Sequence, residues 1–249
     1  MRPIRHALAS VLILGALSAC STLQAPNPLT TWRPSPNFDH RNPQLIVLHL
    51  TAQHGVDESL KTLTDAQAAS PVSAHYLIGR DGRRFQLVAD LDRAWHAGGG
   101  RWGQIRDLND ASLGIELDND GTAAFTEAQI QSLLILLQDL TSRHRIPKTQ
   151  VIAHADLAPS RRTDPGPQFP WQQLFEAGFG QWPLATPPAP EGFDGWLAMQ
   201  AVGYDIRRPA AALRAFRIHF RGRDDGETLT PEFDARDLAI LHALVMQAR

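Results

Sequence analysis

Two short apolar runs, each followed at once by a histidine, constrain this chain more than any other feature. Residues 45–48 read Leu-Ile-Val-Leu and precede His49, and residues 151–153 read Val-Ile-Ala and precede His154. A short continuous apolar run is typical of a strand that is buried on both faces. In open α/β sheets, functional groups gather at the strand ends. The pattern therefore predicts a buried sheet with both histidines at its edge.

Most of the chain up to Trp182 alternates between strand and helix patterns. The Asp81-Gly82 dipeptide between two apolar runs is a hairpin signal, and Thr126 begins a capping-box spacing. The predicted elements are strands over residues 45–50, 72–78, 84–88 and 112–117, a last strand before His154, and helices over residues 56–69 and between Thr126 and Pro147. This order predicts an α/β fold over residues 43–182, with a mixed central sheet and helices on its faces.

A carboxylate completes a candidate metal site with the two histidines. Asp164 lies in the polar loop of residues 161–166. Two imidazoles and one carboxylate, with a fourth position left open, are the ligand set of a hydrolytic zinc ion. The chain has no G-x-S-x-G motif of a serine hydrolase, and its net charge of -2 gives no support for nucleic-acid binding. We therefore predict hydrolysis assisted by one Zn²⁺ that is held by His49, His154 and Asp164.

The N-terminal segment has the pattern of a targeting signal. Residues 1–19 have the pattern of a signal peptide, because two arginines precede an apolar stretch too short to span a bilayer. The tetrapeptide that ends at Cys20, the sole cysteine, resembles the lipobox of bacterial lipoproteins. The alternative is a signal peptide followed by an incidental cysteine. With Ser21 next, we expect lipidation of Cys20, a tether over residues 20–42, and anchoring in the outer membrane of a Gram-negative bacterium, facing the periplasm.

Five separated segments carry a resemblance to a known family. They are residues 46–49, 73–78, 94–98, 113–117 and 154–167. In this order they resemble the type 2 N-acetylmuramoyl-L-alanine amidases, zinc enzymes that trim bacterial peptidoglycan. The lipobox adds a similarity to the outer-membrane lipoprotein branch, which accepts both ordinary and 1,6-anhydro-muropeptides. The resemblance implies hydrolysis of the amide between the lactyl group of (1,6-anhydro-)N-acetylmuramic acid and L-alanine, in peptidoglycan or its fragments.

The same resemblance implies the principal catalytic groups. The family's zinc ligands fall on His49, His154 and Asp164, the three residues already singled out. Glu116 matches the general base that activates the attacking water, and a charge inside this apolar strand is costly unless it is paired or functional. The alternative is an outward-facing glutamate on a solvated strand edge. Arg162 stands where the family more often has a lysine that stabilises the oxyanion. Arginine keeps the charge but changes its geometry.

Three further residues are candidate substrate contacts. Trp95 and His96 precede a glycine-rich stretch that resembles the border of the family's substrate groove, and His96 is expected to contact substrate or to assist the oxyanion. His75 either lies near the cleft or is a buried structural histidine. Asp156 is expected to brace the loop after His154. Asn119 either faces the substrate peptide or simply forms a turn.

After Trp182 the composition changes. Residues 183–191 form a stiff Pro-rich linker, and residues 192–249 contain three helical patterns. These patterns resemble a small three-helix peptidoglycan-binding module, although Arg217 stands where the module usually has glutamine. The alternative is a helical appendage that packs on the catalytic domain and binds nothing.

The sequence thus predicts a lipid-anchored zinc amidase, favoured as a monomer, with peptidoglycan and muropeptides as its partners and no nucleic acid. Two alternatives come from other classes. One is a peptidoglycan-recognition module that binds without cutting. The other is a zinc peptidase that cuts within the stem peptide.

Overall fold

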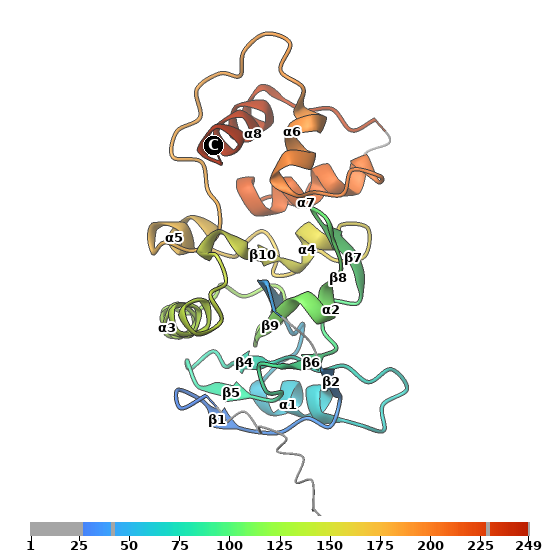
Figure 1. The fold of residues 1–249 in the computed structure, drawn as a ribbon, viewed down its shortest axis with the longest axis vertical. Coiled ribbons are helices and arrows are strands. Elements are labelled where there is room, and N and C mark those ends of the chain that lie inside the picture. Colours follow the sequence, from blue (N-terminus) through green and yellow to red (C-terminus); the bar gives the residue numbers. More distant parts are fainter. Residues whose placement is uncertain (1–26, 41–42, 228–229, 249) are drawn as a thin grey trace, which may run out of the picture.

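A computed structural model describes residues 27–40, 43–227 and 230–248 (Figure 1). The strands are β1 (Thr31–Trp32), β2 (Phe38–His40), β3 (Leu45–Leu50), β4 (Tyr76–Ile78), β5 (Arg84–Gln86), β6 (Asp92–Ala94), β7 (Gly99–Trp102), β8 (Ile105–Asp107), β9 (Ser112–Leu117) and β10 (Val151–Ala153). The helices are α1 (Val56–Thr64), α2 (Leu108–Ala111), α3 (Glu127–His144), α4 (His154–Leu157), α5 (Trp171–Glu176), α6 (Gly195–Val202), α7 (Pro209–Arg221) and α8 (Ala235–Gln247), with a 3-10 turn at Lys148–Gln150.

The central sheet has the strand order β1-β5-β4-β9-β3-β10. Strands β4 and β5 form the antiparallel hairpin predicted from Asp81-Gly82, whereas the other neighbouring pairs in this sheet are parallel. The two interior strands that carry the site, β3 and β9, are buried along almost their whole length, as expected for strands covered on both faces. The predicted mixed α/β sheet is confirmed.

Helices cover both faces of this sheet. This follows from β4, whose alternate residues enter two different apolar clusters. Tyr76 and Ile78 pack in the large cluster that includes the buried face of α3. Leu77, which lies between them, packs in a second cluster with Leu63 and Leu60 of α1. Successive side chains of a strand point to opposite faces, so α3 and α1 lie on opposite sides of the sheet.

Two predicted elements are shorter than expected. The helix predicted over residues 56–69 ends at Thr64, because the side chain of Asp65 accepts a hydrogen bond from the backbone N–H of Gln67 at 2.8 Å. Such a local turn competes with helix continuation. The strand predicted over residues 72–78 is reduced to β4, since Ser73 pairs instead with the carbonyl of Trp95.

The predicted tether over residues 20–42 is partly wrong. Its described portion is folded: β1 pairs with β5, and β2 pairs with β6. Asn27 is buried, and its side chain donates to Asp139 on α3 at 2.7 Å. The predicted signal peptide, Cys20 and the first part of the predicted tether lie outside the described residues. Among the helices of the described ranges, none is long and apolar enough to cross a bilayer.

The three predicted C-terminal helices are present as α6, α7 and α8, and they gather at one end of the molecule (Figure 1). They do not stand apart from the rest, because α7 contacts α4 and their apolar side chains join the same core as β3 and β9. Gly203 approaches Trp102 so closely that an added Cβ would lie 2.6 Å from its ring. The C-terminal helices are therefore packed firmly on the sheet domain.

Candidate active site

Strand register brings the principal site residues together. Strand β3 lies between β9 and β10, and His49 is the register partner of Glu116 on β9. Register partners on neighbouring strands project from the same face of a sheet. On the other side, Leu48 is paired with Ala153, the last residue of β10, so His154 follows directly beside His49.

Three side-chain atoms converge at this edge. The Nδ1 atoms of His49 and His154 are 2.9 Å apart, and each lies close to Oδ2 of Asp164, at 3.2 and 3.1 Å respectively. Ligands about 2.0–2.1 Å from a tetrahedral zinc ion are separated by roughly 3.3 Å. The triangle is therefore of the size that one metal ion would occupy, and these residues form a possible three-ligand metal site.

The protonation states also suit a metal. Burial lowers the pKa of His49 to about 4, with a further contribution from His154, so its imidazole is neutral near pH 7. Burial alone would raise the pKa of Asp164, but the side chains of His154 and His49 beside it hold it well below its usual range. Neutral imidazole and ionised carboxylate are the forms that bind a cation.

The far ring nitrogens of both histidines have fixed partners. Nε2 of His154 donates to the carbonyl of Ala97 at 3.1 Å, which leaves Nδ1 free to bind a metal. Nε2 of His49 lies 2.9 Å from Nδ1 of His96. The His96 ring can occupy this place only because residue 114 is glycine, since an added Cβ would lie 2.4 Å from the ring. The glycine inside strand β9 is a sequence signal for such a close approach, but the sequence alone did not reveal that His96 is the group that approaches it.

Glu116 is the acidic group beside the triangle. Burial raises its pKa to about 8, the charge of Asp164 adds to this effect, and Arg162 opposes it. A bound dication would also oppose it, because positive charge favours the carboxylate. Its Oε2 atom is buried and has no hydrogen-bond partner among the described residues. A partly desolvated carboxylate of this kind is suited to exchange a proton with water or substrate.

These residues open into a cleft of ≈ 660 Å³, which is also lined by Trp95, His96, Arg162 and, on one wall, Leu63 of α1. The size is that of a ligand pocket.

The prediction of His75 as a substrate contact is wrong. This histidine is fully buried, its Nδ1 accepts from the N–H of Gly114, and its Nε2 donates to the carbonyl of Asp92, so it is the structural histidine of the alternative interpretation.

Asp156 and Asn119 take structural positions. Asp156 is fully buried and accepts hydrogen bonds from the backbone N–H of Ala153, from the hydroxyl of Tyr204 and from Nδ1 of His219, at 3.0, 2.6 and 2.7 Å. It therefore braces the start of α4, as expected, and also ties it to the C-terminal helices. Within the described ranges, the side chain of Asn119 bonds to Gly121 and Ala123 of its own turn.

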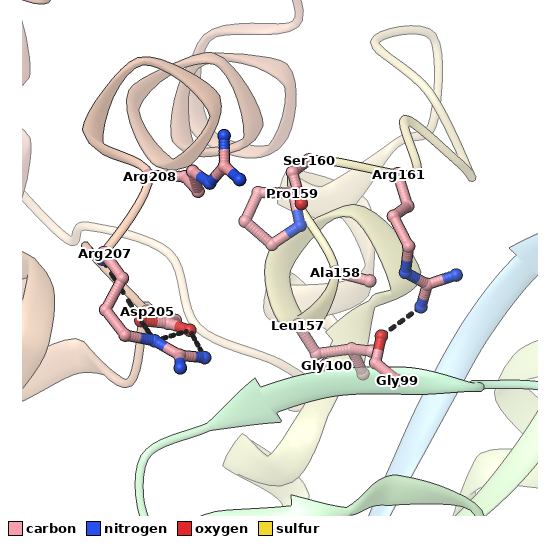
Figure 2. Close-up of a pocket in the computed structure, with 10 residues that line it drawn as sticks. All are labelled: Gly99, Gly100, Leu157, Ala158, Pro159, Ser160, Arg161, Asp205, Arg207 and Arg208. Atoms are coloured by element: carbon pink, nitrogen blue, oxygen red, sulfur yellow. Dashed lines mark hydrogen bonds and ion pairs between the residues drawn. The ribbon is translucent and has the colours of Figure 1, made fainter.

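A smaller pocket lies beside the cleft, between β7, the loop after α4 and the segment that leads into α7 (Figure 2). Its volume is ≈ 320 Å³, and its wall includes Arg161, which also lines the larger cleft. No local sequence pattern marks this pocket, because its walls come from three distant segments.

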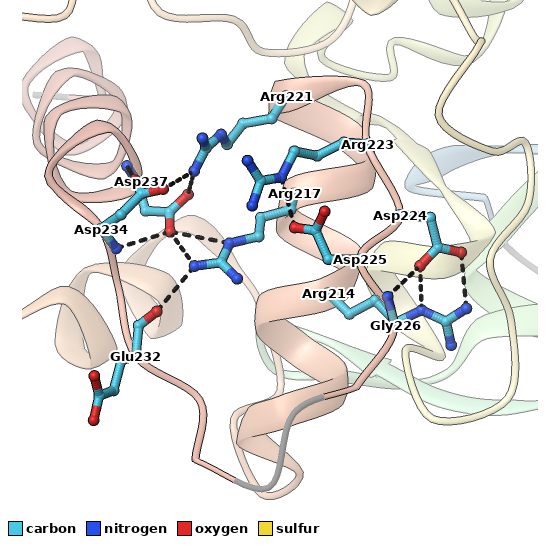
Figure 3. A network of polar contacts seen from close by, with 10 residues as sticks. All are labelled: Arg214, Arg217, Arg221, Arg223, Asp224, Asp225, Gly226, Glu232, Asp234 and Asp237. Atoms are coloured by element: carbon cyan, nitrogen blue, oxygen red, sulfur yellow. Dashed lines mark hydrogen bonds and ion pairs between the residues drawn. The ribbon is translucent and has the colours of Figure 1, made fainter.

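Arg217 lies away from both pockets, in an ion-pair network between α7 and α8 (Figure 3). Its guanidinium donates to the fully buried Asp237 at 2.6 Å and to the carbonyl of Glu232 at 2.9 Å. Arg221 also pairs with Asp237, and the Asp237 carboxylate accepts from the N–H of Asp234 at the start of α8. This arginine therefore joins two helices of the C-terminal module.

Comparison with known proteins gives a consistent result. The model of the N-acetylmuramoyl-L-alanine amidase family (Amidase_2) matches residues 39–167. The N-acetylmuramoyl-L-alanine amidase AmiD of Escherichia coli K12 is 40% identical over 223 residues, which cover 74% of this chain and 79% of that protein. The 1,6-anhydro-N-acetylmuramyl-L-alanine amidase AmpD of Citrobacter freundii is 38% identical over 160 residues, 57% of this chain and 86% of that protein.

A solved structure extends the similarity to the C-terminal helices. It is the complex of AmiD from E. coli with the substrate anhydro-N-acetylmuramic acid-L-Ala-D-gamma-Glu-L-Lys. The two chains superpose with a TM-score of 0.71 at 36% identity, covering 86% of this chain and 93% of the other.

Proposed function

This chain belongs to the N-acetylmuramoyl-L-alanine amidase family, and from that premise we propose that it is a zinc amidase with His49, His154 and Asp164 as the metal ligands. It hydrolyses the amide between the lactyl group of N-acetylmuramic acid, or its 1,6-anhydro form, and L-alanine. The observation that carries the proposal is the convergence of three ligand atoms beside Glu116, the register partner of His49.

The site residues divide the reaction between them. When bound, zinc supplies Lewis acidity and lowers the pKa of water. Glu116 accepts a proton from the attacking water at its buried carboxylate, and the water oxygen bonds to the amide carbon. Arg162, which lines the cleft, donates to the oxygen that becomes negative. Glu116 then passes its proton to the departing nitrogen as the C–N bond breaks, so the peptide leaves with a neutral amine.

The proposal assigns the remaining groups to support and substrate binding. His96 holds the ring of His49 and also lines the cleft, and Trp95 offers an apolar wall to the sugar or peptide. The substrates are muropeptides of both kinds, because relatives named for the ordinary and for the 1,6-anhydro substrate both resemble this chain.

We further propose the location predicted from the N-terminal sequence. Lipidation at Cys20 anchors the protein in the outer membrane, and the catalytic domain faces the periplasm, where peptidoglycan lies. The resemblance of residues 1–20 to a lipoprotein signal supports this location. Radiolabelled palmitate would be incorporated by the wild-type chain and not by a Cys20→Ser variant.

Product analysis tests the activity directly. Purified protein is incubated with zinc and a defined anhydro-muropeptide, and the products are identified by mass spectrometry beside a Glu116→Gln variant. Release of the intact stem peptide by the wild type alone is expected. Cleavage within the stem would identify a peptidase instead, and zinc binding without cleavage would identify a recognition module.

A further inference from the structure

The smaller pocket beside the catalytic cleft carries an excess of positive charge. Its charged lining consists of Arg161, Arg207, Arg208 and Asp205 (Figure 2). Arg207 is already neutralised, because both oxygens of Asp205 accept hydrogen bonds from its guanidinium. Arg161 donates to the backbone carbonyls of Ala97 and Gly99. No carboxylate of the described residues forms an ion pair with it, although Asp164 attracts it at longer range. Arg208 forms no ion pair within the described part of the chain.

The walls of this pocket are held in place. The backbone of Gly100 on β7 touches the loop after α4 so closely that an added Cβ would lie 2.4 Å from the carbonyl oxygen of Leu157. Arg161 is clamped against the same strand by its hydrogen bonds. A positioned guanidinium loses little freedom when it binds an anion, and its planar donors match a carboxylate.

The pocket also adjoins the catalytic cleft, since Arg161 lines both. In the proposed substrate, the carboxylate of the muramic lactyl group is consumed in the amide bond that is cut. The remaining carboxylates all belong to the peptide: the α-carboxylate of the γ-linked glutamate and the carboxylate at the end of the stem. An anion site next to the cleft therefore faces the peptide side of the substrate.

We propose that this pocket is a subsite for a carboxylate of the stem peptide, bound by Arg208 and Arg161 at the junction of the catalytic domain and the C-terminal helices. The inference rests on the proposed amidase function. It gives the C-terminal segment a part in substrate recognition at the active site, through the residues that lead into α7.

The test uses three anhydro-muramoyl tripeptides: the free acid, a form with the glutamate α-carboxylate amidated, and a form with the terminal carboxylate amidated. For the free acid, Arg208→Ala raises KM about 3- to 10-fold, between the effect of an exposed ion pair and that of a charged hydrogen bond. The variant has no effect on the substrate whose bound carboxylate is amidated, and this arm identifies which carboxylate binds. Arg83→Ala, which removes an exposed arginine on the distant β4–β5 turn, leaves KM unchanged for all three.

Equal KM values for wild type and Arg208→Ala with the free acid would overturn the subsite, and so would an equal rise with all three substrates. Calorimetric binding of the free tripeptide L-Ala-D-γ-Glu-L-Lys separates this result from failure of the amidase function. If the wild type cleaves none of the substrates, the function fails. The subsite is still decided by tripeptide binding. Arg208→Ala should weaken binding of the free tripeptide and should not weaken binding of the tripeptide in which the bound carboxylate is amidated.

Discussion

Asp156 offers the sharpest test of how the C-terminal helices relate to the metal site. Its carboxylate accepts three hydrogen bonds in a region without solvent, from Ala153, Tyr204 and His219. Substitution by alanine would leave all three donors without an acceptor. Each buried unsatisfied donor costs roughly 1–3 kcal/mol, and loss of one partner from a buried charged cluster costs about 3–5 kcal/mol. We expect Asp156→Ala to lower the free energy of unfolding by about 3–5 kcal/mol.

A milder change isolates the contact with the C-terminal helices. Tyr204→Phe removes a single donor and is expected to cost about 1–2 kcal/mol. Because Asp156 braces the turn that carries His154, both variants should also bind zinc more weakly, by about 10-fold for the alanine variant. The assays are urea unfolding and competition with a chelator, with the half-exposed Asp225→Ala as a control that changes stability by less than about 0.5 kcal/mol.

Two results would refute this reasoning. A loss of less than about 1 kcal/mol in Asp156→Ala would mean that the network contributes little. Equally, if the effects of Asp156→Ala and Tyr204→Phe add fully in the double variant, the two residues are not coupled, and the hydrogen bond between them does not stabilise the junction.

Three other predictions follow from individual sites. Glu116→Gln should lower kcat by about 10²–10⁴-fold while its zinc content, measured by atomic absorption, stays equal to that of the wild type. Gly114→Ala should displace His96 and weaken zinc binding by about 10-fold in a chelator competition. Gly55→Ala, at a glycine with extended backbone and no atoms near its added Cβ, should leave zinc binding unchanged. Burial would raise the pKa of Asp90, but hydrogen bonds from His144 and Tyr76 outweigh it and hold this pKa at about 2. The ionised carboxylate therefore stabilises the folded state fully above pH ~4, and this stabilisation is lost as pH falls toward 2. The difference in unfolding free energy between wild type and Asp90→Asn, about 2 kcal/mol, should shrink over that interval in acid unfolding curves.

The parts of the site that could be predicted are those with a local signal. His49 and His154 each follow a short buried apolar run, and a charged residue at position 116 interrupts an apolar strand, so the hydrophobic pattern alone marks them. Asp164 lies in a loop without periodicity, and its interpretation as a ligand depended on the family motif around it. The sheet and the helix α3 were predictable for the same reason, since their apolar patterns are long and regular.

The parts that could not be predicted depend on contacts between distant segments. Strand β1 has only two residues and no pattern, and it exists because the edge of β5 offers it hydrogen-bond partners. The buried position of His75 follows from its bonds to Gly114 and Asp92, neither of which is near it in sequence. A strand histidine without such contacts would have the same local sequence.

The contacts at the junction change what a deletion of the C-terminal helices can show. If residues 192–249 served only to hold peptidoglycan, their removal would weaken binding to the cell wall and leave cleavage of a small muropeptide intact. In this structure the deletion would also remove two of the three hydrogen-bond partners of Asp156 and one wall of the smaller pocket beside the catalytic cleft. A loss of activity on the small substrate is therefore the expected outcome, and it would not measure wall binding.

Arg217→Gln is the better probe for binding to the cell wall, because it restores the residue that is usual in the peptidoglycan-binding module. The variant also loses the ion pair with Asp237, and unfolding curves can report that loss separately. Stronger sedimentation of that variant with purified sacculi would show that the module keeps a wall-binding surface; unchanged sedimentation would mean that α7 and α8 act as a structural support.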